Sequence, residues 1–167
     1  MWNFTNGTRA SAAARGFTLI ELVITVAIVG ILASAVVPLN ELVVQRGKEQ
    51  DLRRALREIR EAIDSHKQAS DEGRILKRVG ESGFPKKLED LVAGVEDQKS
   101  PKRERIYFLR RIPSDPFSTD SSLPPVDSWG KRSYASPPDD PKEGEDVFDV
   151  YSLAPGKGIN GRPYREW

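Results

Sequence analysis

The chain has 167 residues, a formal net charge of +1 and no cysteine. This length allows one modest domain, and the near-neutral charge gives no reason to expect a nucleic-acid partner. The lack of cysteine excludes disulfides and thiolate chemistry, so a zinc site would have to use His66 and carboxylates.

The segment from Phe17 to Leu39 is apolar and contains one charged side chain, Glu21. Its length suits a hydrocarbon core of about 30 Å. A charge inside a membrane helix costs about 2.5 to 3.5 kcal/mol, so it persists where a partner or a function compensates. A cut between Gly16 and Phe17 would create an α-amino group at the same depth, able to meet Glu21 of a neighbouring subunit. We therefore interpret Glu21 as an assembly residue.

Residues 15–22, Arg-Gly-Phe-Thr-Leu-Ile-Glu-Leu, resemble the class III signal of type IV pilins and type II secretion pseudopilins. The resemblance implies that a prepilin peptidase cuts between Gly16 and Phe17 and methylates the new N-terminus of Phe17. It also implies a homopolymer, with minor pseudopilins and an inner-membrane assembly platform as further partners. Many type IV pilins close their C-terminal loop with a disulfide, so the lack of cysteine favours a pseudopilin.

The first sixteen residues contain Arg9 and Arg15 and no acid. By the positive-inside rule they should stay in the cytoplasm while the C-terminal head crosses the inner membrane once into the periplasm. The sequons at 3–5 and 6–8 would then lie on the wrong side for glycosylation. An alternative is an ordinary secretory signal cut after Ala33-Ser34-Ala35; Glu21 inside its apolar region argues against it.

We expect one long helix from Phe17 to near Ala69. Its transmembrane half is expected at 17–39, after a leader at 1–16, and its amphipathic half at 40–70. Apolar residues at helical spacing define one stripe along it: Leu39, Leu42, Val43, Leu52, Leu56, Ile59 and Ile63.

Gly30 and Pro38 weaken the membrane half of this helix. Glycine lowers helix preference, and proline removes a backbone donor and clashes with the carbonyl of Ser34. In the family that the chain resembles, this stretch loses helical structure when subunits pack into a filament. Alternatively, the membrane tolerates both residues, and Gly30 and Ser34 form a small-residue packing face.

A periplasmic globular head is expected at 71–167, giving an α+β, pilin-like fold in which the long helix packs on a small antiparallel sheet. Pro85 should begin a short helix that runs to Val92. We expect a loop from Ala93 to Arg105, strands at 132–135 and 147–153, and a turn at 137–141.

Two segments of the head resemble parts of a major pseudopilin. Major pseudopilins contain the run leucine-proline-x-aspartate-proline-tryptophan-glycine. In this chain an insertion splits the corresponding run into residues 115–117 and 127–134. Residues 148–156 resemble the end of the last strand of a major pseudopilin, after which the family holds calcium through aspartates and backbone carbonyls. The loop 157–165 has no acid, so we predict closure by packing of Tyr164 and Trp167 without metal. Asp146 or Asp149 with carbonyls is the remaining alternative for a calcium site.

The remaining motifs indicate no enzyme. Residues 156–161 spell G-x-G-x-x-G, but too few residues follow to build the helix that a phosphate cradle needs. The charged segment 53–61 is interpreted as a solvated helix face whose charges pair with adjacent subunits, and His66 as a surface residue. No catalytic constellation is visible.

These observations predict the structural subunit of a type II secretion pseudopilus, a fibre that grows from the inner membrane to drive protein export. One alternative is a type IV pilin of a surface fibre that serves adhesion, motility or DNA uptake. The other is a membrane-anchored periplasmic module that never polymerises.

Overall fold

The computed structural model describes residues 16–120 and 122–167, with the backbone alone at 35–40. The chain divides into two units, residues 1–42 and 43–167, which are described separately. The elements are α1 (Leu19–Asp71), α2 (Asp90–Ala93), β1 (Val95–Glu96), β2 (Arg105–Ile106), the 3-10 helix η1 (Pro125–Ser128), β3 (Trp129–Arg132), β4 (Asp149–Ser152) and the 3-10 helix η2 (Tyr164–Glu166). The expected leader at 1–16 lies outside the described residues except for Gly16.

Helix α1 begins in the first unit and ends in the second. Its 53 residues match the long helix expected from Phe17 to near Ala69. In the first unit its apolar side chains are exposed: Ile24 and Ile28 are each 52% exposed. Among residues 16–120 and 122–167, no helix has both the length and the apolar character that a membrane crossing requires.

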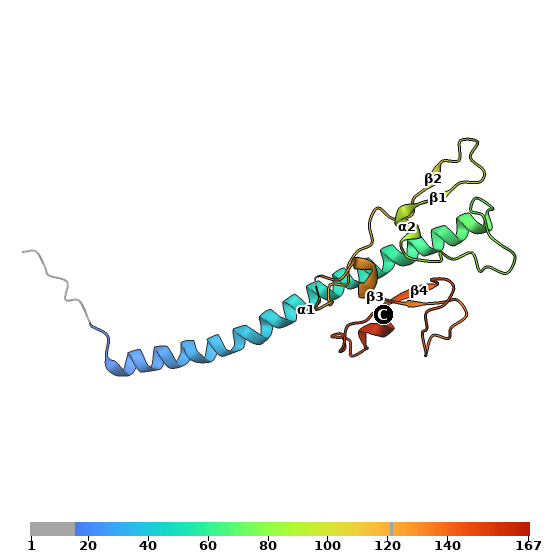
Figure 1. The fold of residues 1–167 in the computed structure, drawn as a ribbon. Coiled ribbons are helices and arrows are strands. Elements are labelled where there is room, and N and C mark those ends of the chain that lie inside the picture. Colours follow the sequence, from blue (N-terminus) through green and yellow to red (C-terminus); the bar gives the residue numbers. More distant parts are fainter. Residues whose placement is uncertain (1–15, 121) are drawn as a thin grey trace, which may run out of the picture. The chain divides into compact units, whose positions relative to one another are not determined.

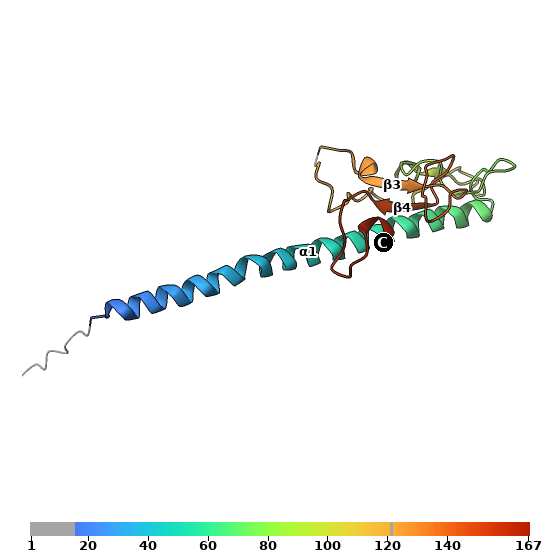
Figure 2. The same ribbon diagram turned by 90° about the horizontal axis from the view of Figure 1, so that it is seen from below.

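The hydrophobic core of the second unit forms on one face of α1. Leu52, Ile59 and Ile63 are fully buried there, spaced so that they fall on one side of the helix. They pack with residues of the later chain: Leu88, Leu91, Leu109, Trp129, Val147, Val150 and Tyr164. Figures 1 and 2 both show β3 and β4 beside the C-terminal half of α1, before its last turns. Leu42 and Val43, which we expected on the same stripe, stay exposed.

Two separate antiparallel pairs form the sheets. β3 pairs with β4, and Trp129 lies opposite Ser152 in their register. Gly130 lies opposite Tyr151, and a Cβ at Gly130 would come within 2.3 Å of the tyrosine ring, so the close approach requires glycine. The strand expected at 147–153 is therefore confirmed by β4. The strand expected at 132–135 is misplaced, because β3 ends at Arg132, where that strand was predicted to begin.

The second pair was not predicted. β1 and β2 form a short hairpin where we expected a loop from Ala93 to Arg105. Strands of two residues are too short to show the alternation that identifies a strand in a sequence. The hairpin is tied to the chain after α1 because Arg74 Nη2 lies 2.6 Å from Asp97 Oδ2. The hydrogen bonds from Arg74 hold the pKa of Asp97 below its usual value.

The short helix after Pro85 begins later than predicted. α2 starts at Asp90 and has four residues. The backbone carbonyl of Pro85 accepts a hydrogen bond from Val147 N at 2.8 Å, so it does not serve a first helical turn. The prediction that Pro85 begins the helix is therefore wrong, because the Pro85 carbonyl oxygen binds the distant strand region at Val147 and α2 begins only at Asp90.

Segments 115–117 and 127–134, the two halves of the run that resembles a major pseudopilin, lie in contact. Asp115, 4% exposed, accepts a hydrogen bond from Ser152 Oγ at 2.5 Å, and its backbone N donates to Ser128 Oγ at 3.1 Å. Trp129 Nε1 donates to the carbonyl of Pro113 at 2.7 Å. The insertion between 117 and 127 therefore leaves the two halves of the run in contact.

Candidate functional site

The expected cleavage bond lies in an exposed segment just before α1. Gly16 and Phe17 have no regular secondary structure, and the Phe17 side chain is 80% exposed. A Cβ at Gly16 would meet no atom within 4 Å. An accessible, non-helical peptide bond is what a processing peptidase needs. The structure therefore places Gly16, Phe17 and Glu21 at one end of the helix, and their roles in cleavage and assembly stay predictions.

Glu21 makes hydrogen bonds within its own chain that the sequence analysis missed. Thr18 N donates to Glu21 Oε2 at 3.4 Å, and Glu21 N donates to Thr18 Oγ1 at 3.3 Å. This reciprocal pair is a capping box, which satisfies two backbone donors at the start of the helix. The Thr-x-x-Glu spacing at 18–21 was the signal that could have predicted it. The acidic charge also interacts favourably with the N-terminal end of the helix dipole.

Gly30 and Pro38 lie further along the same helix. α1 is helical through both positions, and Gly30 has open space around it. At 1.5 Å per residue, Gly30 is roughly 13 Å from Glu21 along the axis. Gly30 and Pro38 therefore lie away from the segment at 16–21, and their role in helix flexibility stays a prediction.

A second cluster of polar residues attaches the C-terminal loop to α1. Glu49 is 6% exposed, and its Oε1 accepts hydrogen bonds from Ile159 N at 2.8 Å and from Tyr164 Oη at 3.2 Å. Gln45 Nε2 donates to both Glu49 Oε1 and Tyr164 Oη. Burial, together with the charge of Glu49, raises the pKa of Tyr164 above its usual value. Sequence reasoning missed Glu49, since its partners in the C-terminal loop lie more than a hundred residues away.

The aromatic packing predicted for the loop is present. The rings of Tyr164 and Trp167 lie 5.2 Å apart in a T-shaped arrangement, and Phe117 stacks on Tyr164 at 4.3 Å. The segment 156–161 contains bends and turns and is followed by η2, which has three residues. The rejection of a dinucleotide site there stays a prediction.

His66 is buried, so its interpretation as a surface residue is wrong. Its side chain is 6% exposed and lies 5.2 Å from the Phe108 ring. The carbonyl of Gly83, 3.2 Å from Nδ1, can only accept, so Nδ1 carries the proton. Burial lowers the pKa of His66. The loop after α1 folds back over the end of the helix, which the sequence did not reveal.

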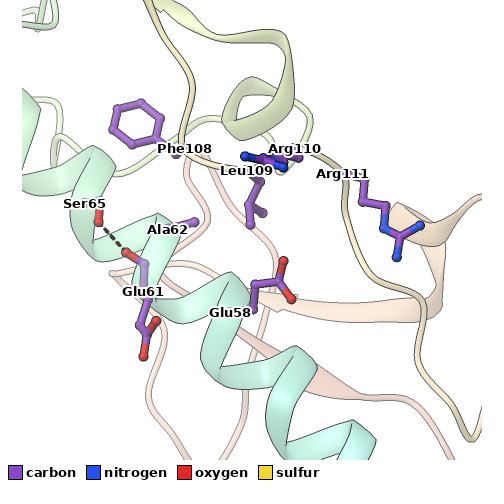
Figure 3. A pocket seen from close by; sticks show the side chains of 8 residues that line it. All are labelled: Glu58, Glu61, Ala62, Ser65, Phe108, Leu109, Arg110 and Arg111. Atoms are coloured by element: carbon purple, nitrogen blue, oxygen red, sulfur yellow. Dashed lines mark hydrogen bonds between the residues drawn. The ribbon is translucent and has the colours of Figure 1, made fainter.

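An open groove of about 690 Å³ runs between α1 and the segment 108–111. Figure 3 shows acidic Glu58 and Glu61 on the helix and Arg110 and Arg111 on the facing segment. All four side chains are exposed, and no ion pair joins the acids to the arginines in the described part of the chain. The groove therefore offers charges of both signs to a neighbouring molecule.

Comparisons with known proteins agree with the resemblance in the sequence. Residues 11–37 match the prokaryotic N-terminal methylation motif. The chain is 27% identical over 152 residues to type II secretion system core protein G of Dickeya chrysanthemi, covering 88% of this chain and 92% of that protein. The chain is therefore similar to core protein G, and its arrangement of one long helix and small antiparallel sheets is pilin-like.

Other relatives give the same result. Core protein G of Pectobacterium carotovorum subsp. carotovorum is 28% identical over 148 residues, which is 84% of this chain and 76% of that protein. Core protein G of Klebsiella pneumoniae is 29% identical over 113 residues, which is 65% of this chain and 73% of that protein. No solved structure gives a significant match. The similarity to core protein G therefore extends from the N-terminal motif into the head of this pilin-like protein.

Proposed function

We propose that the chain is the structural subunit of a type II secretion pseudopilus that polymerises from the inner membrane. The supporting observation is the N-terminal motif at 11–37 together with similarity to core protein G over 88% of the chain. The first concerns methylation of a new N-terminus and the second a core component of a secretion system, so both support a processed subunit of that system.

The assembly step depends on the charge of Glu21. Cleavage after Gly16 gives Phe17 a cationic amine, which methylation leaves charged. In the subunit alone, Glu21 already accepts a hydrogen bond from Thr18 N, which uses one carboxylate oxygen. A carboxylate accepts several hydrogen bonds, so the amine of an incoming neighbour is able to bind it without breaking the capping box. In a membrane this ion pair is strengthened by the low dielectric constant.

We place the mature subunit in the inner membrane with its head in the periplasm. The N-terminal motif and the core protein G relatives support this location. The prepilin peptidase, minor pseudopilins and the assembly platform are proposed partners on the same grounds. Bending at Gly30 and Pro38 during assembly belongs to the same proposal.

Replacing Glu21 tests the assembly step. Glu21→Gln removes the charge and keeps the shape, and Glu41→Gln is a matched control because Glu41 is an exposed acid on the same helix. Both variants should enter the membrane and lose residues 1–16 normally. Only Glu21→Gln should fail to form sedimentable fibres. If Glu21→Gln forms fibres as the native chain does, the assembly role is wrong.

The same variant separates the competing functions. A monomeric periplasmic module would insert better without the charge and keep its function. A surface pilin would lose its fibres like a pseudopilin, but its fibres would be found outside the cell when overproduction is avoided. The location of fibres at native expression levels therefore distinguishes secretion from surface display.

A further inference from the structure

The pilin-like resemblance implies a calcium ion in the loop after β4, held by aspartates and carbonyls. Calcium requires six to eight oxygen ligands, several of them from carboxylates. Residues 157–165 contain no acid, and Glu166 is exposed. In the described part of the chain, no cluster of three or more histidine, cysteine, aspartate or glutamate residues has the geometry to hold a metal. The residues of this loop therefore do not fit the ion.

The oxygen atoms beside β4 are instead bound by an arginine of α1. Arg60 Nε donates to Asp149 Oδ1 at 2.8 Å. Arg60 Nη2 donates to the backbone oxygens of Val150 at 3.1 Å and Trp167 at 2.6 Å. One side-chain carboxylate and two backbone oxygens from separate segments thus converge on a single guanidinium, and oxygens of these kinds are the ligands that calcium takes.

The two aspartates that could have served a metal are already bound. Asp149 Oδ2 lies 3.3 Å from Arg132 Nη2, so both of its oxygens face a guanidinium. Asp146 accepts hydrogen bonds from the Ser82 hydroxyl and from Tyr134 N. A divalent cation near Asp149 would meet two positive charges at short range, which opposes its binding.

The rest of the loop is closed by α1 and by packing. Arg53 lies 4.5 Å from the Trp167 ring, in a cation–π contact. A Cβ at Gly158 would come within 2.2 Å of Trp167, so glycine is required for the ring to pack there. Glu49 binds Ile159 N in the same loop. The loop is thus attached to the helix at both of its ends.

We propose that Arg60 is the resident cation of the C-terminal loop and orders it in place of calcium. An arginine side chain is charged at every physiological pH, and its planar fork binds several oxygens in fixed directions. The loop therefore folds at any calcium concentration. This inference concerns the head and does not depend on the polymerisation proposed above.

Proteolysis of the loop in the full processed chain, held in detergent micelles, tests the proposal. A lysine-specific protease that needs no calcium cuts after Lys157, and mass spectrometry measures release of residues 158–167. In the native chain the rate should be the same in millimolar calcium and in EGTA. Arg60→Ala should raise the rate at Lys157 about tenfold or more, since it removes charge-assisted hydrogen bonds. Arg57→Ala is the matched control, because Arg57 is exposed and bonds to Arg53 O of its own helix.

Two further measurements keep the test decisive if Arg60→Ala does not fold. Arg60→Lys keeps the charge but loses the fork, so its cleavage rate should lie between those of the native chain and the alanine variant. Calorimetric titration of the native chain with calcium should give no micromolar binding. The proposal is overturned if calcium slows cleavage in the native chain, if it binds at micromolar concentration, or if Arg60→Ala and Arg57→Ala are cleaved equally.

Discussion

The two units use the same residue types on the same helix in opposite ways. Ile24 and Ile28 in residues 1–42 are half exposed, whereas Ile59 and Ile63 in residues 43–167 are fully buried. In the second unit the apolar side chains are covered by the subunit's own head. In the first unit the apolar side chains are exposed, and the proposed function requires them to contact lipid and neighbouring subunits. The difference shows that hydrophobic spacing alone does not reveal whether a stripe is covered by its own chain.

The largest expected effect separates these two sets of isoleucines. Ile63→Ala should lower the free energy of unfolding of the head by about 2 to 5 kcal/mol, because it leaves a cavity in a packed core. Ile28→Ala should change it by less than about 0.5 kcal/mol. Denaturant unfolding of the full chain in detergent, followed by tryptophan fluorescence, measures both values. Equal effects from the two variants would remove the distinction between the units.

A smaller effect is expected where the loop attaches to α1. Glu49→Ala leaves Ile159 N and Tyr164 Oη without their acceptor, so it should cost about 1 to 3 kcal/mol. Glu61→Ala, an exposed acid on the same helix, should cost less than about 0.5 kcal/mol. The same unfolding experiment compares them. A Glu49 variant as stable as the Glu61 variant would show that the buried carboxylate contributes nothing to the head.

The stability of the head should also depend on pH through His66. Burial lowers the pKa of His66 in the folded state, while an unfolded histidine keeps a pKa of about 6.5. As the pH falls from about 7 toward 5, the unfolded state takes up the proton first, so the free energy of unfolding decreases. His66→Asn keeps a donor for Gly83 O and should flatten this decrease. Unfolding curves at several pH values test this, and an equal slope in both proteins would contradict it.

The smallest effect concerns the groove between α1 and segment 108–111. If its charges pair between neighbouring subunits, Arg110→Glu should weaken fibres by at most about 1 kcal/mol per contact, and the loss should shrink at high salt. Glu58→Arg in the same chain should restore part of the fibre yield, and Lys102→Glu serves as an exposed control. If the fibre yield changes neither with salt concentration nor with Arg110→Glu, the groove is not part of the interface between subunits.

The elements with strong local signals could be predicted from the sequence. Helix α1 was predicted to within two residues because its apolar residues recur at helical spacing, which is a local signal. The alternating segment 147–153 predicted the strand that forms β4. Residues 15–22 carried most of the family resemblance, and the matched N-terminal motif at 11–37 contains them.

The features that the sequence did not reveal depend on distant contacts. Arg60 and His66 were interpreted as exposed helix residues and Glu49 was not singled out, yet each is held by the backbone of a loop that returns to α1. Pro85 was predicted to begin a helix, but its carbonyl oxygen accepts a hydrogen bond from Val147 N. No periodicity within a segment reports which loop will return to it, so such residues follow only from the fold.

One measurement tests the central claim, that Glu21 of one subunit binds the amine of Phe17 in another. Fibres assembled from a mixture of isotope-labelled and unlabelled subunits are treated with a carbodiimide, which joins carboxylates to amines in direct contact, and the products are identified by mass spectrometry. The account predicts linked peptides in which Phe17 comes from a labelled subunit and Glu21 from an unlabelled one. Fibres whose Phe17 amine links only to Glu21 of the same chain, or not to Glu21 at all, would contradict it.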